Sequence, residues 1–221
     1  MKFSKKSVAV LAVVTIGLIV FMFFHEKTPP IINGNQIKTV ALIDYPSEFN
    51  YRQSTNDCGP FSTAAVVRAL NGEEVDSQVF TEEIGWRLSN GYTLPWGLEK
   101  QIEKSGIIVE KPNLAPLSYD EKILFLQEQL SQKKPAIILG EIDGFEHYIT
   151  IFGFDALKDE FYIYDSLYDK NPDSAELTKD NNANLPGNRT LSSQELLDFW
   201  RGGGMYGIYE WYGVVASMTT F

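Results

Sequence analysis

The chain of 221 residues has one cysteine, Cys58, and only two histidines, His25 and His147. So few soft ligands cannot form a zinc site without carboxylates at ligand spacing, and no such spacing is found. A glycine-rich phosphate loop is also missing, because Gly202–Gly204 follow a predicted helix and do not open one. These absences exclude the common metal and nucleotide sites, and we expect no cofactor.

Basic residues are in short supply too, with 19 Lys and Arg against 29 Asp and Glu and a net charge of −10. Phosphate binding needs clustered Lys and Arg, and no basic stripe is present, so we expect no nucleic-acid partner. Hydrophobic residues make up 44% of the chain, which is enough for a sizeable core. The sequence is therefore that of a globular protein.

The N-terminus predicts a membrane anchor. Residues 1–6 form a basic tail, and residues 7–24 are an uncharged stretch of 18 residues, long enough to span a bilayer. The exit, Phe21–His25, has no small-x-small cleavage site, which favours an uncleaved signal anchor over a cleaved signal peptide. The lysines of the tail should stay in the cytoplasm. We therefore expect a single-pass protein of the cell membrane whose main domain lies outside the cytoplasm.

The remaining chain divides into a turn-rich linker, residues 25–36, and one domain, residues 37–221. Apolar spacing and capping residues predict helices at 59–70, 77–88, 95–104, 119–132 and 192–200. Short apolar runs predict strands at 135–142, 146–155, 160–166 and 207–218. Most helices precede the strands, so we expect an α+β fold with an antiparallel sheet.

A polar segment, Asp169–Arg189, separates the last predicted strands and has the composition of a surface loop. At its end, Asn188, Arg189 and Thr190 match the acceptor pattern for N-glycosylation. That pattern is short and arises often by chance.

Cys58 has the position of a nucleophile. Asn56 and Asp57 are good helix caps and Pro60 suits a first helical turn, so the thiol lies at the N-terminal end of a predicted helix. The exposed amides and the helix dipole favour a thiolate there. A nucleophilic thiol also needs a base. His25 is next to the predicted span, which leaves His147.

Asp165 is the predicted partner that orients the imidazole. If 155–159 form a hairpin loop, Ile151 lies opposite Ile163, and His147 and Asp165 are diagonal neighbours on one face, with backbones roughly 7 to 8 Å apart. A register slip of one residue would separate them. Asp143 and Asp155 are competing candidates for the same role.

A developing oxyanion requires hydrogen-bond donors. The backbone amide of Cys58 is one candidate, and the side-chain amide of Gln53, five residues upstream, is the other.

This set of residues resembles the papain-like cysteine peptidases, and within them the peptidase family thirty-nine-like group, which includes the bacteriocin-processing double-glycine leader peptidases. The resemblance rests on Gln53, the D-C-G-P run of Asp57–Pro60, the strand HYITIFGFD of His147–Asp155, Asp165 and the closing segment Gly202–Ala216. It covers about residues 40–220 and implies a papain-like fold, a helical lobe packed on an antiparallel sheet. The spacing from glutamine to cysteine is one residue shorter than in leader peptidases, and no transporter domain follows.

The resemblance implies a cysteine peptidase that hydrolyses peptide amide bonds through Cys58, His147 and Asp165, with a peptide or protein substrate. Two other functions stay open. The chain could be an amidase or acyl transferase that acts on a non-protein amide, or a membrane-tethered binding module with an inactive site. An intermolecular disulfide through Cys58 is a further alternative.

Overall fold

The computed structural model describes residues 28–53, 55–72, 74–167, 184–205 and 207–218. The predicted basic tail 1–6 and the predicted span 7–24 lie outside these residues, as does most of the predicted loop. No helix within the described ranges is long and apolar enough to cross a membrane. The membrane span therefore stays a prediction from the sequence.

The second half of the predicted linker contacts the domain. It forms a short 3-10 helix, η1 (Gly34–Gln36). The amide of Asn33 donates to a carboxylate oxygen of Glu128 at 3.1 Å, and Ile32 packs against the core. Residues of the predicted linker thus lie against the domain.

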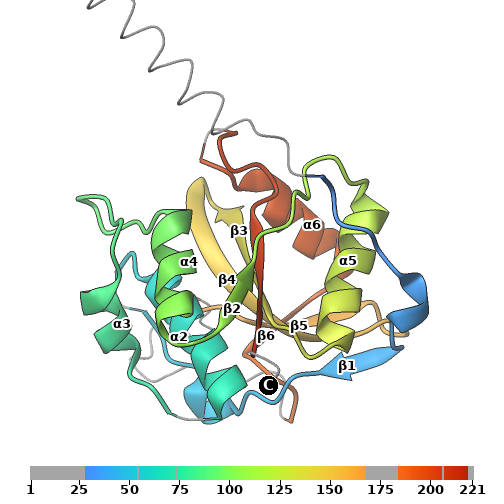
Figure 1. Cartoon of the computed structure of the whole chain (residues 1–221), viewed down its shortest axis with the longest axis horizontal. Helices are drawn as coiled ribbons and strands as arrows, with labels where there is room; N and C mark the ends of the chain where they lie inside the picture. Colours follow the sequence, from blue (N-terminus) through green and yellow to red (C-terminus); the bar gives the residue numbers. More distant parts are fainter. Residues whose placement is uncertain (1–27, 54, 73, 168–183, 206, 219–221) are drawn as a thin grey trace, which may run out of the picture.

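The described strands form one antiparallel sheet of seven strands (Figure 1). Their order is β2 (Ile108–Glu110), β7 (Gly213–Ser217), β3 (Ala136–Ile142), β4 (Phe145–Asp155), β5 (Glu160–Tyr164) and β6 (Arg189–Leu191), and β1 (Val40–Leu42) pairs with the end of β4. The predicted α+β class with an antiparallel sheet is confirmed. The sequence did not indicate β1, β2 and β6, because three residues are too few to show strand alternation.

Helices cover both faces of the sheet (Figure 1). The helices are α2 (Cys58–Asn71), α3 (Ser77–Glu83) and α4 (Pro95–Lys104) on one side, and α5 (Tyr119–Ser131) and α6 (Ser193–Gly202) on the other. Along β3, Ile137 and Leu139 belong to the core with α4, whereas Ile138 belongs to the core with α5 and α6. The prediction of one helical lobe is corrected in this respect. The reason is visible in β3 itself, which is apolar at successive positions, as expected of a strand buried on both faces.

α4 has the predicted bounds, but α3 ends at Glu83 where the sequence pattern predicted a helix to Leu88. Ile84 is extended, and Trp86 has a positive φ of 57°. The chain then turns back, with Arg87 opposite Thr93. The apolar spacing of Trp86 and Leu88 is thus not helical, because Gly85 and the turn interrupt the helix.

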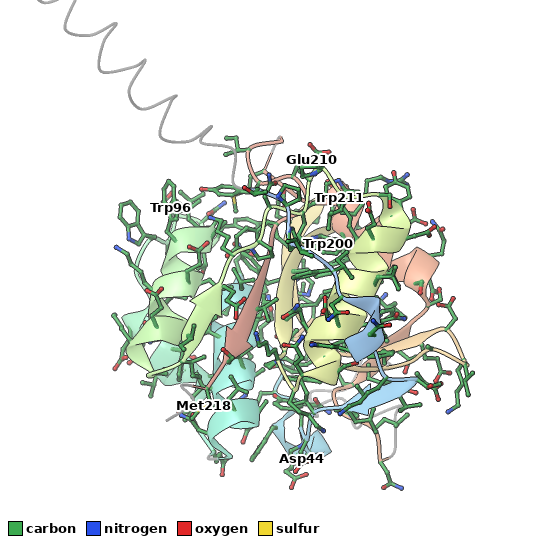
Figure 2. The ribbon with its side chains drawn as sticks, turned by 45° about the vertical axis from the view of Figure 1, so that its right-hand side comes forward. Asp44, Trp96, Trp200, Glu210, Trp211 and Met218 are labelled. Atoms are coloured by element: carbon green, nitrogen blue, oxygen red, sulfur yellow. The ribbon has the colours of Figure 1, made fainter. Side chains whose placement is uncertain are left out.

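The tryptophans divide between the core and the surface. Trp200 is fully buried and its indole N–H donates to the carbonyl of Tyr212 at 2.8 Å. Trp211 packs edge to face against it, with ring centroids 5.6 Å apart. Figure 2 shows Trp200 within the molecule and Trp96 at its edge. The core on the α6 side thus holds the segment that leads into β7 in place.

Candidate active site

The thiol of Cys58 lies at the first residue of α2 and is 3% exposed. Asp57 is the N-cap residue, but its side chain makes no capping hydrogen bond. Its carboxylate instead accepts from Arg87 at 2.6 Å and from the hydroxyl of Thr55 at 2.6 Å. The predicted helix start is confirmed within one residue, and the amides of the first turn are left free of a side-chain cap.

The segment between α3 and α4 fixes the start of α2. Arg87 also donates to the carbonyl of Asn56, next to Asp57. Thr93 lies against Gly59, so closely that a Cβ on Gly59 would be 2.7 Å from the Cβ of Thr93. The carbonyl of Thr93 accepts from the hydroxyl of Tyr148 on β4. Cys58 is therefore held between a loop on one side and β4 on the other.

α2 packs directly on β4 through two hydrogen bonds at Ser62. Its hydroxyl donates to the carbonyl of Tyr148, and its carbonyl accepts from the hydroxyl of Thr150, both at 3.4 Å. These contacts bring the helix start to the part of β4 that carries His147.

His147 is 1% exposed and lies near the start of β4, opposite Gly140 of β3. Its Nε2 atom is 2.7 Å from Oδ1 of Asp165, and its Nδ1 atom has no hydrogen-bond partner among the described residues. The rings of His147 and of Phe199 on α6 are nearly perpendicular, with centroids 6.3 Å apart. Phe199 also packs on Gly140, where any side chain would collide with it. The imidazole is thus oriented by Asp165 and fixed by packing.

Charges around the ring decide its protonation. Burial opposes the imidazolium, but the hydrogen bond to Asp165 and the neighbouring Cys58 thiol group outweigh it and raise the pKa of His147 to about 9. Since Nε2 is engaged with Asp165, Nδ1 is the nitrogen left to exchange a proton with Cys58.

Asp165 follows β5 directly and is also 1% exposed. Burial alone would raise its pKa, but the hydrogen bond to His147 and the charges of His147 and Arg189 lower it, and so does the amide of Leu167. The carboxylate is therefore ionised under ordinary conditions.

The predicted strand register holds next to the site. Ile151 lies opposite Ile163, and Thr150 opposite Tyr164. Further along β4, the register shifts by one residue between Ile151 and Gly153. This bulge lies on the side away from His147, so the predicted diagonal between His147 and Asp165 is unaffected.

The competing carboxylates lie elsewhere. Asp155 is at the opposite end of β4, where it accepts from the amides of Leu157 and Lys158 in the turn. Asp143 is exposed at the tip of the hairpin between β3 and β4, with a positive φ of 50°. Of the three candidates, Asp165 is the one whose carboxylate bonds the imidazole.

Gln53 is buried and is tied to the segment of Asp165. Its backbone amide donates to the carbonyl of Ser166, and its side-chain oxygen accepts from the hydroxyl of Ser166. Its side-chain nitrogen donates to the carbonyl of Thr55. One N–H of that amide group is already used, and the second is the one left for a substrate.

Two residues that contact Asp165 were not predicted from the sequence. Asn188 forms hydrogen bonds with the backbone of Asp165, and Arg189 donates to the carboxylate of Asp165. Asn188 is 2% exposed, so the glycosylation pattern is not an accessible acceptor in the folded chain. The prediction of a surface loop up to Arg189 is also wrong at this end, because Arg189 begins β6. Only the pairing of β6 with β5 brings these residues to the site, and a three-residue strand gives no sequence signal.

In the part of the chain that the structure describes, no group of three or more His, Cys, Asp or Glu could hold a metal ion. What the site does contain is a thiol at a helix start, an imidazole within its reach, and a carboxylate bonded to that imidazole. These features define the class of papain-like cysteine peptidases.

Comparison with known proteins agrees with this class. The profile of the Peptidase_C39 like family matches residues 42–184, more than half of the chain. The chain belongs to this family and is a cysteine-type peptidase, so the resemblance found in the sequence is confirmed. No match is found among curated proteins.

Comparison with solved structures finds similar chains, including the following two. One is a double glycine motif protease from an AMS/PCAT transporter in complex with the leader peptide, with 16% identity, a TM-score of 0.51, and coverage of 81% of this chain and 95% of that chain. The other is the peptidase domain of Streptococcus ComA, a bi-functional ABC transporter involved in a quorum sensing pathway. It has 14% identity, a TM-score of 0.46, and coverage of 76% and 97%.

Proposed function

We propose that the chain is a membrane-anchored cysteine peptidase, with its domain outside the cytoplasm, that hydrolyses peptide amide bonds through Cys58, His147 and Asp165. One observation carries the catalytic part of the proposal. Nε2 of His147 is bonded to Asp165, while Nδ1 has no hydrogen-bond partner in the described part of the chain and Cys58 lies close enough to shift the pKa of the ring.

The reaction follows from these positions. Transfer of the Cys58 proton to His147 gives the thiolate and imidazolium pair of the resting site, and the thiolate attacks the substrate carbonyl carbon to form a tetrahedral intermediate. The oxyanion accepts from the backbone N–H of Cys58 and from the second side-chain N–H of Gln53. As the intermediate collapses, the C–N bond breaks and the imidazolium gives its proton to the leaving amine. A water molecule, deprotonated by His147, then hydrolyses the thioester.

A peptide substrate is supported by family membership and by the similar structure of a protease that holds a leader peptide. An amidase or an acyl transferase would use the same first step. The two reactions differ in the acceptor, so the products formed with and without an added amine distinguish them.

The catalytic proposal is tested by alkylation and by cleavage with the full chain in detergent micelles. We expect iodoacetamide to modify Cys58 faster at pH 6 in the wild type than in His147→Ala, because only the wild type can hold a thiolate and imidazolium pair. We also expect new N-termini when a proteome-derived peptide library is added, and none with Cys58→Ala. Equal alkylation rates, together with no cleavage, would contradict the proposal and favour a binding module.

The membrane part is tested separately. The uncharged stretch of residues 7–24, preceded by the lysines of the basic tail, supports the anchor. We expect the full chain to stay in the membrane fraction at alkaline pH and a chain without residues 1–24 to be released. An alkaline phosphatase fused after Phe221 should be active if this end lies outside the cytoplasm. An inactive fusion would reverse the topology.

A further inference from the structure

The two residues that contact Asp165 from β6 suggest an addition to the site. Asn188 bonds the backbone of Asp165 at both ends. Its side-chain oxygen accepts from the amide of Asp165, and its side-chain nitrogen donates to the carbonyl of Asp165, each at 2.9 Å. This pair of bonds is buried, so both polar ends of the Asn188 side chain are satisfied by one residue.

The backbone before Asn188 is shaped for this contact. Gly187 has a positive φ of 80°, and a Cβ there would be 2.1 Å from the carbonyl oxygen of Ile163. That same carbonyl accepts from the amide of Asn188 at 2.9 Å. The carbonyl of Gly187 accepts from the buried side chain of Asn50. Only glycine allows the approach, and the approach places Asn188 beside Asp165.

Arg189 adds a charge to the carboxylate. Its guanidinium donates to Oδ2 of Asp165 at 2.9 Å, whereas Oδ1 is bonded to His147 and to the amide of Leu167. The Arg189 side chain is 30% exposed, and that of Asp165 is 1% exposed. The carboxylate of Asp165 thus interacts with two cationic groups whenever His147 is protonated.

We propose that Asn188 and Arg189 are positioning residues of the active site: Asn188 fixes the backbone of Asp165, and Arg189 competes with His147 for its carboxylate. The inference rests on the proposed function of His147 and Asp165. It concerns residues beyond the segment that the family profile matches, which ends at residue 184.

The competition predicts the direction in which the pKa of His147 changes when Arg189 is replaced. Because Asn188 and Leu167 hold Asp165 independently of Arg189, loss of the guanidinium leaves the carboxylate in place. The carboxylate then interacts with the imidazolium alone, and a positive charge nearby is removed. Both changes favour the protonated ring, so the pKa of His147 rises. A purely structural role would have the opposite effect, since a displaced Asp165 would stabilise the imidazolium less.

The other groups around His147 do not change the expected direction of this pKa shift. Cys58 of α2 is the second titratable group that faces the ring. β3 places Gly140 opposite it, and α6 contributes the uncharged Phe199. Glu146, the preceding residue on β4, is bonded to the backbone amides of Gly204 and Met205.

The test is an NMR titration of the full chain labelled at the histidine Cε1 carbon. The chain has only two histidines, so two signals are followed, and His25 serves as an internal reference. We expect Arg189→Met to raise the midpoint of His147 by roughly 0.5 to 1 pH unit, as for a partly exposed charge a short distance beyond the carboxylate. Arg189→Lys keeps the charge and should stay close to the wild type. Arg201→Met on α6 is the matched control and should cause no shift.

Asn188→Ala gives the second readout. We expect its His147 midpoint to fall below that of the wild type, because the backbone of Asp165 is released. An unchanged or lowered midpoint in Arg189→Met, or an unchanged midpoint in Asn188→Ala, would overturn the proposal. The titration needs no substrate, so it fails independently of the cleavage and alkylation tests of the proposed function.

Discussion

Protonation of His147 is coupled to folding. Its pKa is raised from 6.5 to about 9 in the folded chain. The folded state therefore binds more protons at His147 than the unfolded state between these values, and the contribution of His147 to stability falls as pH rises. The contribution is fully present below about pH 6.5 and is lost as the pH rises through about 9, and it amounts to on the order of 3 kcal/mol.

Urea unfolding of the full chain from pH 6 to pH 9.5 measures this contribution. We expect the free energy of unfolding to fall more steeply with pH in the wild type than in His147→Ala. Because the wild type alone loses the contribution of His147, the difference between the two curves should shrink over the same range. Parallel curves for the two proteins would contradict a net uptake of a proton at this position on folding.

The scarcity of cysteine and histidine narrowed the choice of candidate site residues. With one cysteine and two histidines in the chain, Cys58 and His147 could be assigned almost by elimination, and strand alternation then indicated Asp165. Asn188 and Arg189 could not be found in this way. Their role depends on β6, which begins at Arg189, 24 residues after Asp165. This strand of three residues is too short to show a periodic pattern.

At the scale of elements, the start of α2 depends on contact with the segment before α4. Gly59 leaves space for Thr93, because a Cβ added to Gly59 would lie 2.7 Å from the Cβ of Thr93. We expect Gly59→Ala to displace Thr93 or the helix start and to lower the free energy of unfolding by about 1–3 kcal/mol, as overpacking does. The rate at which Cys58 is alkylated should change with it, because the thiol is the preceding residue.

The matched control is Gly34→Ala, since nothing lies within 4 Å of a Cβ at Gly34. Its free energy of unfolding should stay within about 0.5 kcal/mol of the wild type. Urea unfolding and iodoacetamide kinetics on both variants make the comparison. Equal behaviour of the two variants would mean that the contact between Gly59 and Thr93 does not hold the helix start.

The elements that the sequence predicted well are those with strong local signals. α4 begins with a proline at Pro95, α5 has a capping box at Ser118 and Glu121, and both have the predicted starts. α3 was predicted too long, because the apolar residues after Gly85 lie in a turn and not in the helix. The bulge in β4 could not be predicted, since β4 is buried throughout this stretch and apolar on either register.

At the scale of the whole molecule, two cores on opposite faces of one sheet meet at the site. Cys58 belongs to the core with α2 and α4, whereas Phe199, which contacts His147, packs on the core with α5 and α6. The sheet between them joins the nucleophile to its base. Because both cores close around this point, the reacting side chains are almost completely covered.

This closure predicts that access to the thiol depends strongly on the size of the reagent. Cys58 is 3% exposed and His147 is 1% exposed, so we expect a bulky molecule to reach the sulfur only when the site opens locally. We expect iodoacetamide to modify the native chain, while a maleimide carried on a polyethylene glycol chain of several kilodaltons reacts much more slowly. Mass spectrometry counts the products directly, because the chain has a single thiol.

Two controls separate access from reactivity. In urea, both reagents should modify Cys58 completely. In the native double variant Cys58→Ala with Asp198→Cys, both should react readily, because the side chain of Asp198 is 50% exposed. If the large reagent modified native Cys58 as fast as it modifies this exposed cysteine, the site would be open in solution. A strong size dependence, lost in urea, would instead show that substrate entry requires the two cores to part around Cys58.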